Sequence, residues 1–177
     1  MLRIWCNLLY YNASVEFILR EFKREDFDIL WGIDQKCFPP GISYSRIELA
    51  AYIRRRGSLT LVAESADAQR EAAGPAILGF IVAEVDRRGI GHIITIDVIT
   101  AARRFGIGSS LLDAAEVGLR AAQCRSVRLE TAVDNLGALA FYKRRGYFLE
   151  KTVPQYYSNG VDALVLRKDL LPQAKSS

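Results

Sequence analysis

One junction constrains this chain more than any other feature: an apolar strand that passes into a helix through a turn with two glycines. HIITIDVIT at 92–100 predicts the strand, apolar residues at helical spacing predict a helix over 107–122, and Arg-x-x-Gly-x-Gly stands between them. A helix start carries N–H groups without intrahelical partners and a partial positive charge, and glycines let a ligand approach the backbone closely. The junction therefore predicts an anion site. The side chains that add charge or hydroxyl donors to it are Arg103, Arg104, Ser109 and Ser110.

Two familiar phosphate-binding patterns do not fit this turn. A P-loop has lysine after its last glycine, whereas Ser109 follows Gly108 here. A dinucleotide fingerprint has a third glycine, whereas the matching residue is Leu111. From the glycines alone, a turn that only relieves crowding between strand and helix is as good an interpretation as an anion site.

Strand and helix signals alternate on both sides of this junction. Short apolar runs predict further strands at 15–22, 59–65, 76–88, 126–133, 147–153 and 162–170. Apolar residues at helical spacing predict further helices at 24–38, 45–57 and 135–147. The strands on either side of 88–91 are expected to form a hairpin. A strand–helix–strand core between antiparallel pairs predicts one three-layer α/β domain with a mixed sheet.

Composition narrows the partners and the environment. The 177 residues carry a net charge of +4, which is too small to predict nucleic-acid binding but suits a ligand that bears phosphate. Three widely spaced cysteines, Cys6, Cys37 and Cys124, predict neither a disulfide framework nor a metal site, so we expect a reducing cytosol. No apolar run reaches the roughly 20 residues of a membrane span. We expect an arm of unknown role at 1–14, one domain at 15–170 and a tail at 171–177.

Three further motifs accompany the glycine turn. They are CFPPGISYSRIELAAYI before it, and LETAVDNLGALAFYKRRGY and QYYSNGVDALVLRKDL after it. With Arg-x-x-Gly-x-Gly, they resemble the GNAT superfamily of N-acetyltransferases over about residues 16–170. The first and the last motif resemble the branch that acetylates protein N termini, the ribosomal-protein alanine N-acetyltransferases and their relatives. The resemblance implies the GNAT fold, an α/β domain with a mixed, centrally splayed sheet flanked by helices.

The same resemblance implies that the glycine turn holds the pyrophosphate of acetyl-CoA. The backbone of Val98 and Ile99 would pair with the pantetheine arm as an added strand, which requires strands 92–100 and 126–133 to separate at one end. Asn135 would cap the next helix and contact pantetheine. The residues expected to bind acetyl-CoA are Val98, Ile99, Arg103, Arg104, Phe105, Gly106, Ile107, Gly108, Ser109, Ser110, Asn135 and Tyr142.

Three residues are candidates for the proton transfers of such a reaction. By resemblance, Tyr142 would protonate the departing thiolate, and a phenol with a pKa near 10 keeps its proton at neutral pH. Glu130 matches the general-base glutamate of the ribosomal-protein branch, and His92, the only histidine, would assist it because imidazole titrates near neutral pH. The residues alone also allow simpler roles: a core aromatic, a solvent-facing carboxylate, and a structural histidine that shares a strand face with Ile94 and Ile96.

The resemblance also implies an acceptor site. Tyr156 and Tyr157 would bind the first backbone groups of a peptide, and a loop would line the pocket for its first residue. That loop contributes Phe38, Pro39 and Ile42. Ordinary packing on the sheet is the simpler role for each of these residues. ETAVDN stands where the branch more often has Glu-Val-Arg-x-x-Asn, which leaves part of the substrate contacts open.

These expectations predict an acetyl-CoA-dependent N-acetyltransferase that acts on the α-amine of a protein N terminus, and the ribosomal-protein alanine type is the leading expectation. Two alternatives stay open: an acetyltransferase for small amines and a CoA-binding regulatory domain without turnover. The paired tyrosines argue against the first, and Glu130 with Tyr142 argues against the second. We expect a cytoplasmic monomer or weak dimer that binds neither nucleic acid nor membrane.

Overall fold

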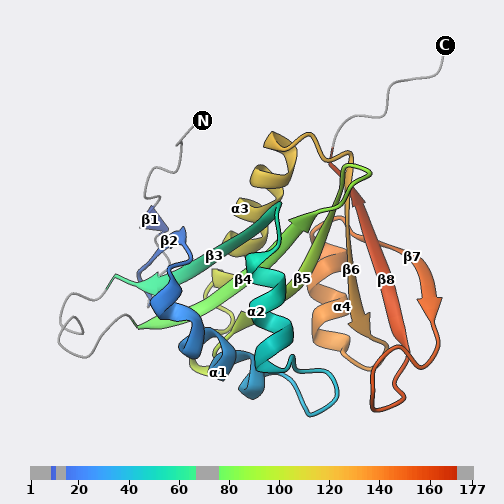
Figure 1. The fold of residues 1–177 in the computed structure, drawn as a ribbon, viewed down its shortest axis with the longest axis horizontal. Coiled ribbons are helices and arrows are strands. Elements are labelled where there is room, and N and C mark those ends of the chain that lie inside the picture. Colours follow the sequence, from blue (N-terminus) through green and yellow to red (C-terminus); the bar gives the residue numbers. More distant parts are fainter. Residues whose placement is uncertain (1–8, 11–14, 67–75, 171–177) are drawn as a thin grey trace.

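The computed structural model describes residues 9–10, 15–66 and 76–170. This part of the chain forms an eight-stranded sheet in the order β1-β2-β3-β4-β5-β6-β8-β7 (Figure 1). The strands are β1 (Leu9–Tyr10), β2 (Phe17–Glu21), β3 (Ser58–Ser65), β4 (Ile77–Val85), β5 (Ile90–Val98), β6 (Ser126–Ala132), β7 (Phe148–Val153) and β8 (Ala163–Asp169). The helices are α1 (Phe27–Cys37), α2 (Arg46–Arg54), α3 (Ile107–Ala121) and α4 (Leu136–Arg144), with 3-10 turns at Arg24–Asp26 and Thr100–Ala102.

The sheet is mixed. All neighbouring strands in the described sheet are antiparallel except β5 and β6, which run parallel. Helices α1 and α2 cover one face, and α3 and α4 lie on the other (Figure 1). The prediction of a three-layer α/β domain with a mixed sheet is therefore confirmed.

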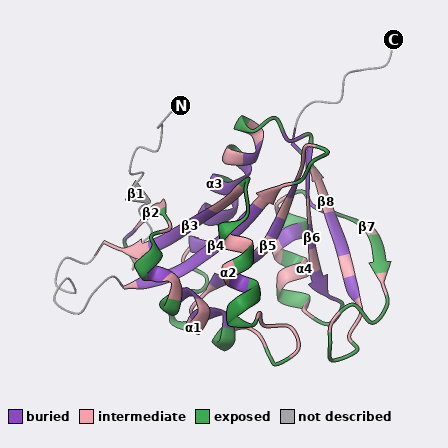
Figure 2. Cartoon of the chain, viewed as in Figure 1, coloured by how far each residue is buried: buried purple, intermediate pink, exposed green. Residues whose placement is uncertain are grey.

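Two hydrophobic clusters hold the layers together, one on each face of the sheet. The α3 face buries Ile107, Leu111, Ala115 and Leu119, the residues whose spacing predicts the helix. The opposite face packs α1 and α2 against the sheet. Strand β4 supplies apolar side chains to both clusters and is buried over most of its length, as Figure 2 shows for the central strands. Each fully buried aliphatic side chain contributes roughly 1.5–3 kcal/mol, so the central strands are the most strongly held part of the sheet.

The parallel pair separates after three residues. Strands β5 and β6 are in register only at Ile90↔Ser126, Gly91↔Val127 and His92↔Arg128. Beyond these positions β5 continues to pair with β4, and β6 with β8. The predicted separation of these two strands at one end is confirmed, and it leaves a gap between their carboxyl halves.

A β-bulge in β5 changes which side chains share a face. Val82 is opposite Thr95 and Ala83 is opposite Ile93, so Ile94 is an extra residue in β5. Alternation of side chains restarts after a bulge. Ile94 accordingly packs in the cluster of α1 and α2, whereas Ile96 packs in the cluster of α3. The expectation that His92 shares a face with both isoleucines is wrong for Ile96.

The remaining differences lie at element ends. The strand expected at 92–100 spans Ile90–Val98, because residues 100–102 form a 3-10 turn instead. Of the expected arm, residues 9–10 pair with β2; the rest of the arm, most of the connection at 66–75 and the tail lie outside the described residues. Among the helices that the structure describes, none combines the length and the apolar character needed to cross a membrane.

Candidate active site

The turn before α3 has the geometry of an anion site. Gly106 is the residue before the helix and adopts a left-handed conformation, with φ of 85°, that glycine tolerates best. The amide of Ser110 donates to the carbonyl of Gly106 at 2.9 Å, which makes it the first amide that bonds within the helix. The three preceding amides, 107–109, therefore have no intrahelical acceptor. Ser110 itself is buried, whereas Ser109 is half-buried.

Arg103 connects this turn to the gap in the sheet. Its Nε donates to the carbonyl oxygen of Val98 at 3.0 Å, and its Nη2 lies 3.6 Å from Sγ of Cys37. The amide of Ile99 donates to Leu78 on β4. Because neighbouring residues of an antiparallel strand direct their backbone groups to opposite sides, those of Val98 point toward the gap. Gly108 adjoins the same point, since a Cβ there would lie 3.7 Å from Cγ2 of Val98.

Helix α4 places Tyr142 in the core beside the gap. The side chain of Asn135 accepts from the amide of Ala138 at 3.1 Å, so the predicted cap is confirmed. Tyr142 is 5% exposed, and its ring makes edge contacts with Phe141 and Tyr147 at centroid distances of 5.1 and 5.3 Å. Burial, and then the charge of Asp97, raise the pKa of Tyr142 above its usual 10, so its phenol stays protonated at neutral pH.

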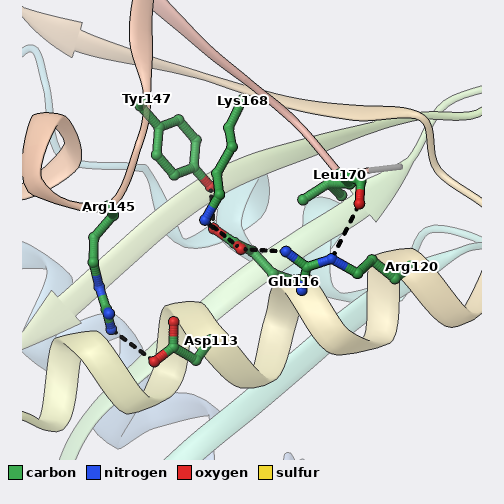
Figure 3. A network of polar contacts seen from close by, with 7 residues as sticks. All are labelled: Asp113, Glu116, Arg120, Arg145, Tyr147, Lys168 and Leu170. Carbon is green, nitrogen blue, oxygen red and sulfur yellow. Dashed lines mark hydrogen bonds and ion pairs between the residues drawn. The ribbon is translucent and has the colours of Figure 1, made fainter. Parts of the chain in front are cut away.

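A buried charge network fixes the tyrosine that packs against Tyr142 (Figure 3). The hydroxyl of Tyr147 donates to Glu116 Oε1 at 3.1 Å, and Glu116 is 2% exposed on α3. Lys168 from β8 donates to both oxygens of Glu116 at 2.7 and 2.9 Å, and Arg120 donates to one at 3.0 Å. The network ties α3, β8 and the end of α4 together, and so supports the position of Tyr142.

His92 and Glu130 meet on the face that α1 and α2 cover. His92 is in register with Arg128, and Glu130 stands two residues further along β6 on the same side. His92 Nε2 lies 2.6 Å from Glu130 Oε2. The Glu130 side chain is 20% exposed, so it is not the freely solvated carboxylate that strand alternation alone would allow. Burial lowers the pKa of His92, but the hydrogen bond and charge of Glu130 and the charge of Glu84 outweigh it and raise the pKa above 6.5.

Three tyrosines lie near Glu130 and a fourth packs against one of them; sequence reasoning identified only two of the four. The rings of Tyr156 and Tyr157 make an edge contact at 5.0 Å, and those of Tyr44 and Tyr52 at 5.3 Å. Burial, then neighbouring phenols and the charge of Glu130, raise the pKa of Tyr44 and of Tyr157. Tyr44 donates its hydroxyl to the carbonyl of Ile94, the bulge residue, at 3.2 Å. Its sequence signal is weak: it lies only two residues beyond Ile42, in the loop expected to contact the acceptor.

Two loops from opposite ends of the chain meet next to these tyrosines. The loop between α1 and α2, which contains Phe38, Pro39 and Ile42, accepts a hydrogen bond at Gly41 from Ser158 Oγ at 3.2 Å. Ser158 directly follows Tyr157 in the loop between β7 and β8. Phe38 and Ile42 are half-buried and Pro39 is exposed. The residues expected to contact an acceptor thus lie in two loops that touch.

The arrangement places the glycine turn, a gap in the sheet and two sets of ionisable side chains in one part of the molecule. Tyr142 lies on the α4 side of the gap, and Glu130 with His92 lies on the other. Tyr157 lies near both of these sets. After burial and the charge of Asp97, the charge of Tyr157 is the next cause that raises the pKa of Tyr142. Among the described residues, no group of three or more His, Cys, Asp or Glu side chains is placed to hold a metal ion. Such a site suits acid–base group transfer from a ligand that bears phosphate.

Comparison with known proteins agrees with this geometry. Residues 24–147, more than half of the chain, match the acetyltransferase (GNAT) family. An uncharacterized N-acetyltransferase of Methanocaldococcus jannaschii is 32% identical over 159 residues, covering 89% of this chain and 94% of that protein. Human N-alpha-acetyltransferase 30 is 36% identical over 100 residues, which is 53% of this chain but only 27% of the human protein. A chain in the crystal structure of the NatC complex bound to Gag peptide and CoA superimposes with a TM-score of 0.73 and 25% identity, over 88% of this chain and 99% of that one.

Proposed function

The chain belongs to the acetyltransferase (GNAT) family, and from that membership we propose that it transfers the acetyl group of acetyl-CoA to the α-amine of a protein N terminus. One observation carries the proposal: the short contact between His92 and Glu130 lies among tyrosines, on the side of the gap opposite Tyr142. A base on one side and an acid on the other suit an amine that attacks a thioester held between them.

The residues around the gap fit acetyl-CoA. The amides at 107–109 would hold its pyrophosphate, with Arg103 at the edge of the turn and without a Cβ at Gly106 or Gly108 to block the approach. The backbone groups of Val98 would pair with the pantetheine arm as a neighbouring strand would. Arg103 would then exchange the Val98 carbonyl for a phosphate, a partner of opposite charge.

The proton balance assigns one task to each side of the gap. An ammonium group carries three protons and the amide product carries one, so one proton must leave to solvent and one must reach the thiolate. Glu130 with His92 would take the first, which frees the lone pair that attacks the thioester carbonyl. Tyr142 would give its proton to the departing thiolate and regain one from the nitrogen as the intermediate collapses.

An α-amine suits this base better than a lysine side chain does. The α-amino group has a pKa near 7.7–8.0, against about 10.4 for lysine, so a carboxylate and an imidazole remove a proton from a more acidic ammonium group. The hydroxyls of Tyr156 and Tyr157 would bind the first peptide groups, which a small amine lacks. A ribosomal protein as acceptor, a monomeric or weakly dimeric state and a cytoplasmic location remain predictions from the sequence.

The test compares three acceptors under the same conditions. Turnover of acetyl-CoA is measured with a panel of peptides that have free N termini, with the same peptides whose α-amine is blocked and which retain a lysine, and with polyamines and amino acids. We expect acetylation of the free N termini only. Preference for a small amine would replace the proposal with the small-amine alternative, and acetyl-CoA binding without turnover would replace it with a regulatory domain.

A further inference from the structure

A second carboxylate flanks His92 on the side opposite Glu130. Glu84 on β4 is the register partner of His92 on β5, and His92 is the partner of Arg128 on β6. Glu84 therefore lies directly beside His92, and Glu130 stands two residues beyond Arg128 on the third strand. His92 Nε2 lies 2.6 Å from Glu130 Oε2, and its Nδ1 lies 3.9 Å from Glu84 Oε1. The two ring nitrogens thus face two different carboxylates.

These two distances decide which ring nitrogen can take up a proton. Two hydrogen-bond acceptors repel each other at 2.6 Å, so beside an ionised Glu130 the hydrogen of neutral His92 must be on Nε2. The lone pair of the ring is then on Nδ1, the nitrogen that faces Glu84. A proton that His92 takes up arrives on Nδ1, where the carboxylate of Glu84 stabilises the imidazolium.

We propose that Glu84 is a positioning residue that faces Nδ1 of His92, the proton-accepting atom that Glu130 sets, and stabilises the proton there until it leaves to water. This rests on the proposed function, in which Glu130 and His92 take the proton of the amine. One proton passes from the ammonium group to Nδ1 and then to solvent, no electrons are transferred, and both carboxylates return to their initial state. Glu84 thus acts on the reaction through His92 and contacts no reacting atom.

A cavity of about 190 Å³ provides room for this transfer. Glu130, His92 and Glu84 all line it. The side chain of His92 is 32% exposed and that of Glu84 is 17% exposed, so both side chains are partly accessible to water. The charged groups that face the ring or the cavity are Glu84 from β4, Asp86 from the turn after β4, Arg55 from the end of α2, and Arg128 and Glu130 from β6.

The charges around the cavity support a role for Glu84 in setting the proton affinity of His92. Arg55 donates to both oxygens of Glu84 at 3.2 and 3.3 Å, which fixes the carboxylate and offsets part of its charge. Burial lowers the pKa of His92, Glu130 and then Glu84 raise it, and Arg55 lowers it. Removing Glu84 or Arg55 should therefore move that pKa in opposite directions.

The test uses the fact that His92 is the only histidine in the chain. Its ring can be followed by NMR in the full-length, isotopically labelled protein without ambiguity. We expect the neutral ring to carry its hydrogen on Nε2, and the pKa of His92 to fall in Glu84→Gln and to rise in Arg55→Met. Asp86→Asn is the matched control, because it removes one negative charge from the same cavity while its amide oxygen still accepts from Arg88 and Ile90. Its effect on the His92 pKa should be smaller.

Activity provides the second measurement. In Glu84→Gln, the acidic limb of kcat/KM for a peptide should move to lower pH together with the NMR pKa, while KM for acetyl-CoA stays unchanged. A hydrogen on Nδ1 in the neutral ring, or equal pKa changes in Glu84→Gln and Asp86→Asn, would overturn the proposal. Should Glu84→Gln fail to fold, Arg55→Met still tests it, because an unchanged pKa there contradicts it. The expected NMR result without peptide acetylation would refute the proposed function and still support the stabilisation of the Nδ1 proton by Glu84.

Discussion

Two tyrosines in ring contact should give opposite results when each loses only its hydroxyl. Tyr142→Phe keeps the ring that packs against Phe141 and Tyr147. Among the described residues its hydroxyl makes no hydrogen bond, so we expect the free energy of unfolding to change by less than about 1 kcal/mol. A positioned general acid contributes roughly 10²–10⁴-fold, so turnover should fall by that factor, which is about 3–5 kcal/mol in the activation barrier. KM for acetyl-CoA should change little, since the phosphates bind elsewhere.

Tyr147→Phe is the matched control for this prediction. Its hydroxyl donates to Glu116 at 3.1 Å, and a hydrogen bond to a buried charge contributes roughly 1.5–3 kcal/mol. We expect the free energy of unfolding in urea to fall by this amount. The loss should not be larger, because Lys168 and Arg120 still neutralise Glu116. Turnover at a temperature where both variants are folded should stay within about threefold of the unchanged enzyme, well short of the effect of a lost general acid. Full turnover in Tyr142→Phe would make Tyr142 a packing residue and refute its assignment as the acid.

Three further predictions concern the glycine turn, the acceptor side and the stability of the fold. Gly108→Ala should preserve the fold, because its Cβ would lie 3.7 Å from Val98, while the larger Gly108→Val should reduce acetyl-CoA affinity by a large factor in calorimetry; equal affinities would remove the turn from the binding site. Tyr157→Ala should raise KM for peptides and leave acetyl-CoA binding unchanged, and the opposite pattern would contradict its role with the acceptor. Burial raises the pKa of Asp34 from 3.8 to about 6, so the folded state loses stability as pH rises between these values. Asp34→Asn should reduce that loss in urea denaturation across the same range, and an unchanged pH dependence would refute it.

The helix at the glycine turn shows what the sequence can predict well. Helix α3 begins at Ile107 and ends at Ala121, within one residue of the expected bounds. Both of its signals are local: apolar residues recur at helical spacing, and a glycine stands where the backbone must adopt positive φ. The separation of β5 from β6 has no such local signal, and it was expected only because the motifs resemble a known family.

The bulge at Ile94 and the position of Tyr44 show where sequence reasoning fails. Strand β5 carries isoleucines on both faces, so inserting one residue leaves no break in the apolar pattern. Tyr44 stands in a loop, and only the packing of α2 against the sheet brings its hydroxyl to the carbonyl of Ile94. Both features depend on contacts between elements: Tyr44 is 50 positions from Ile94, and the bulge exists only in the pairing of β5 with β4. Periodicity, which compares close neighbours in the sequence, cannot detect them.

The topology explains how the sheet can open at its centre and remain stable. Strands β5 and β6 are the one parallel pair in the described sheet, so the connection between them must cross over, and α3 provides that crossover. The N terminus of α3 therefore lies at the carboxyl end of β5, where the two strands separate and where open α/β sheets bind their ligands. Strand β6 does not need β5 for its stability, because it pairs with β8 along its whole length from Ser126 to Ala132. Beyond the three paired residues, the backbone groups of β5 that face β6 therefore remain available to a ligand. They lie at the same point where the unpaired amides of α3 favour an anion.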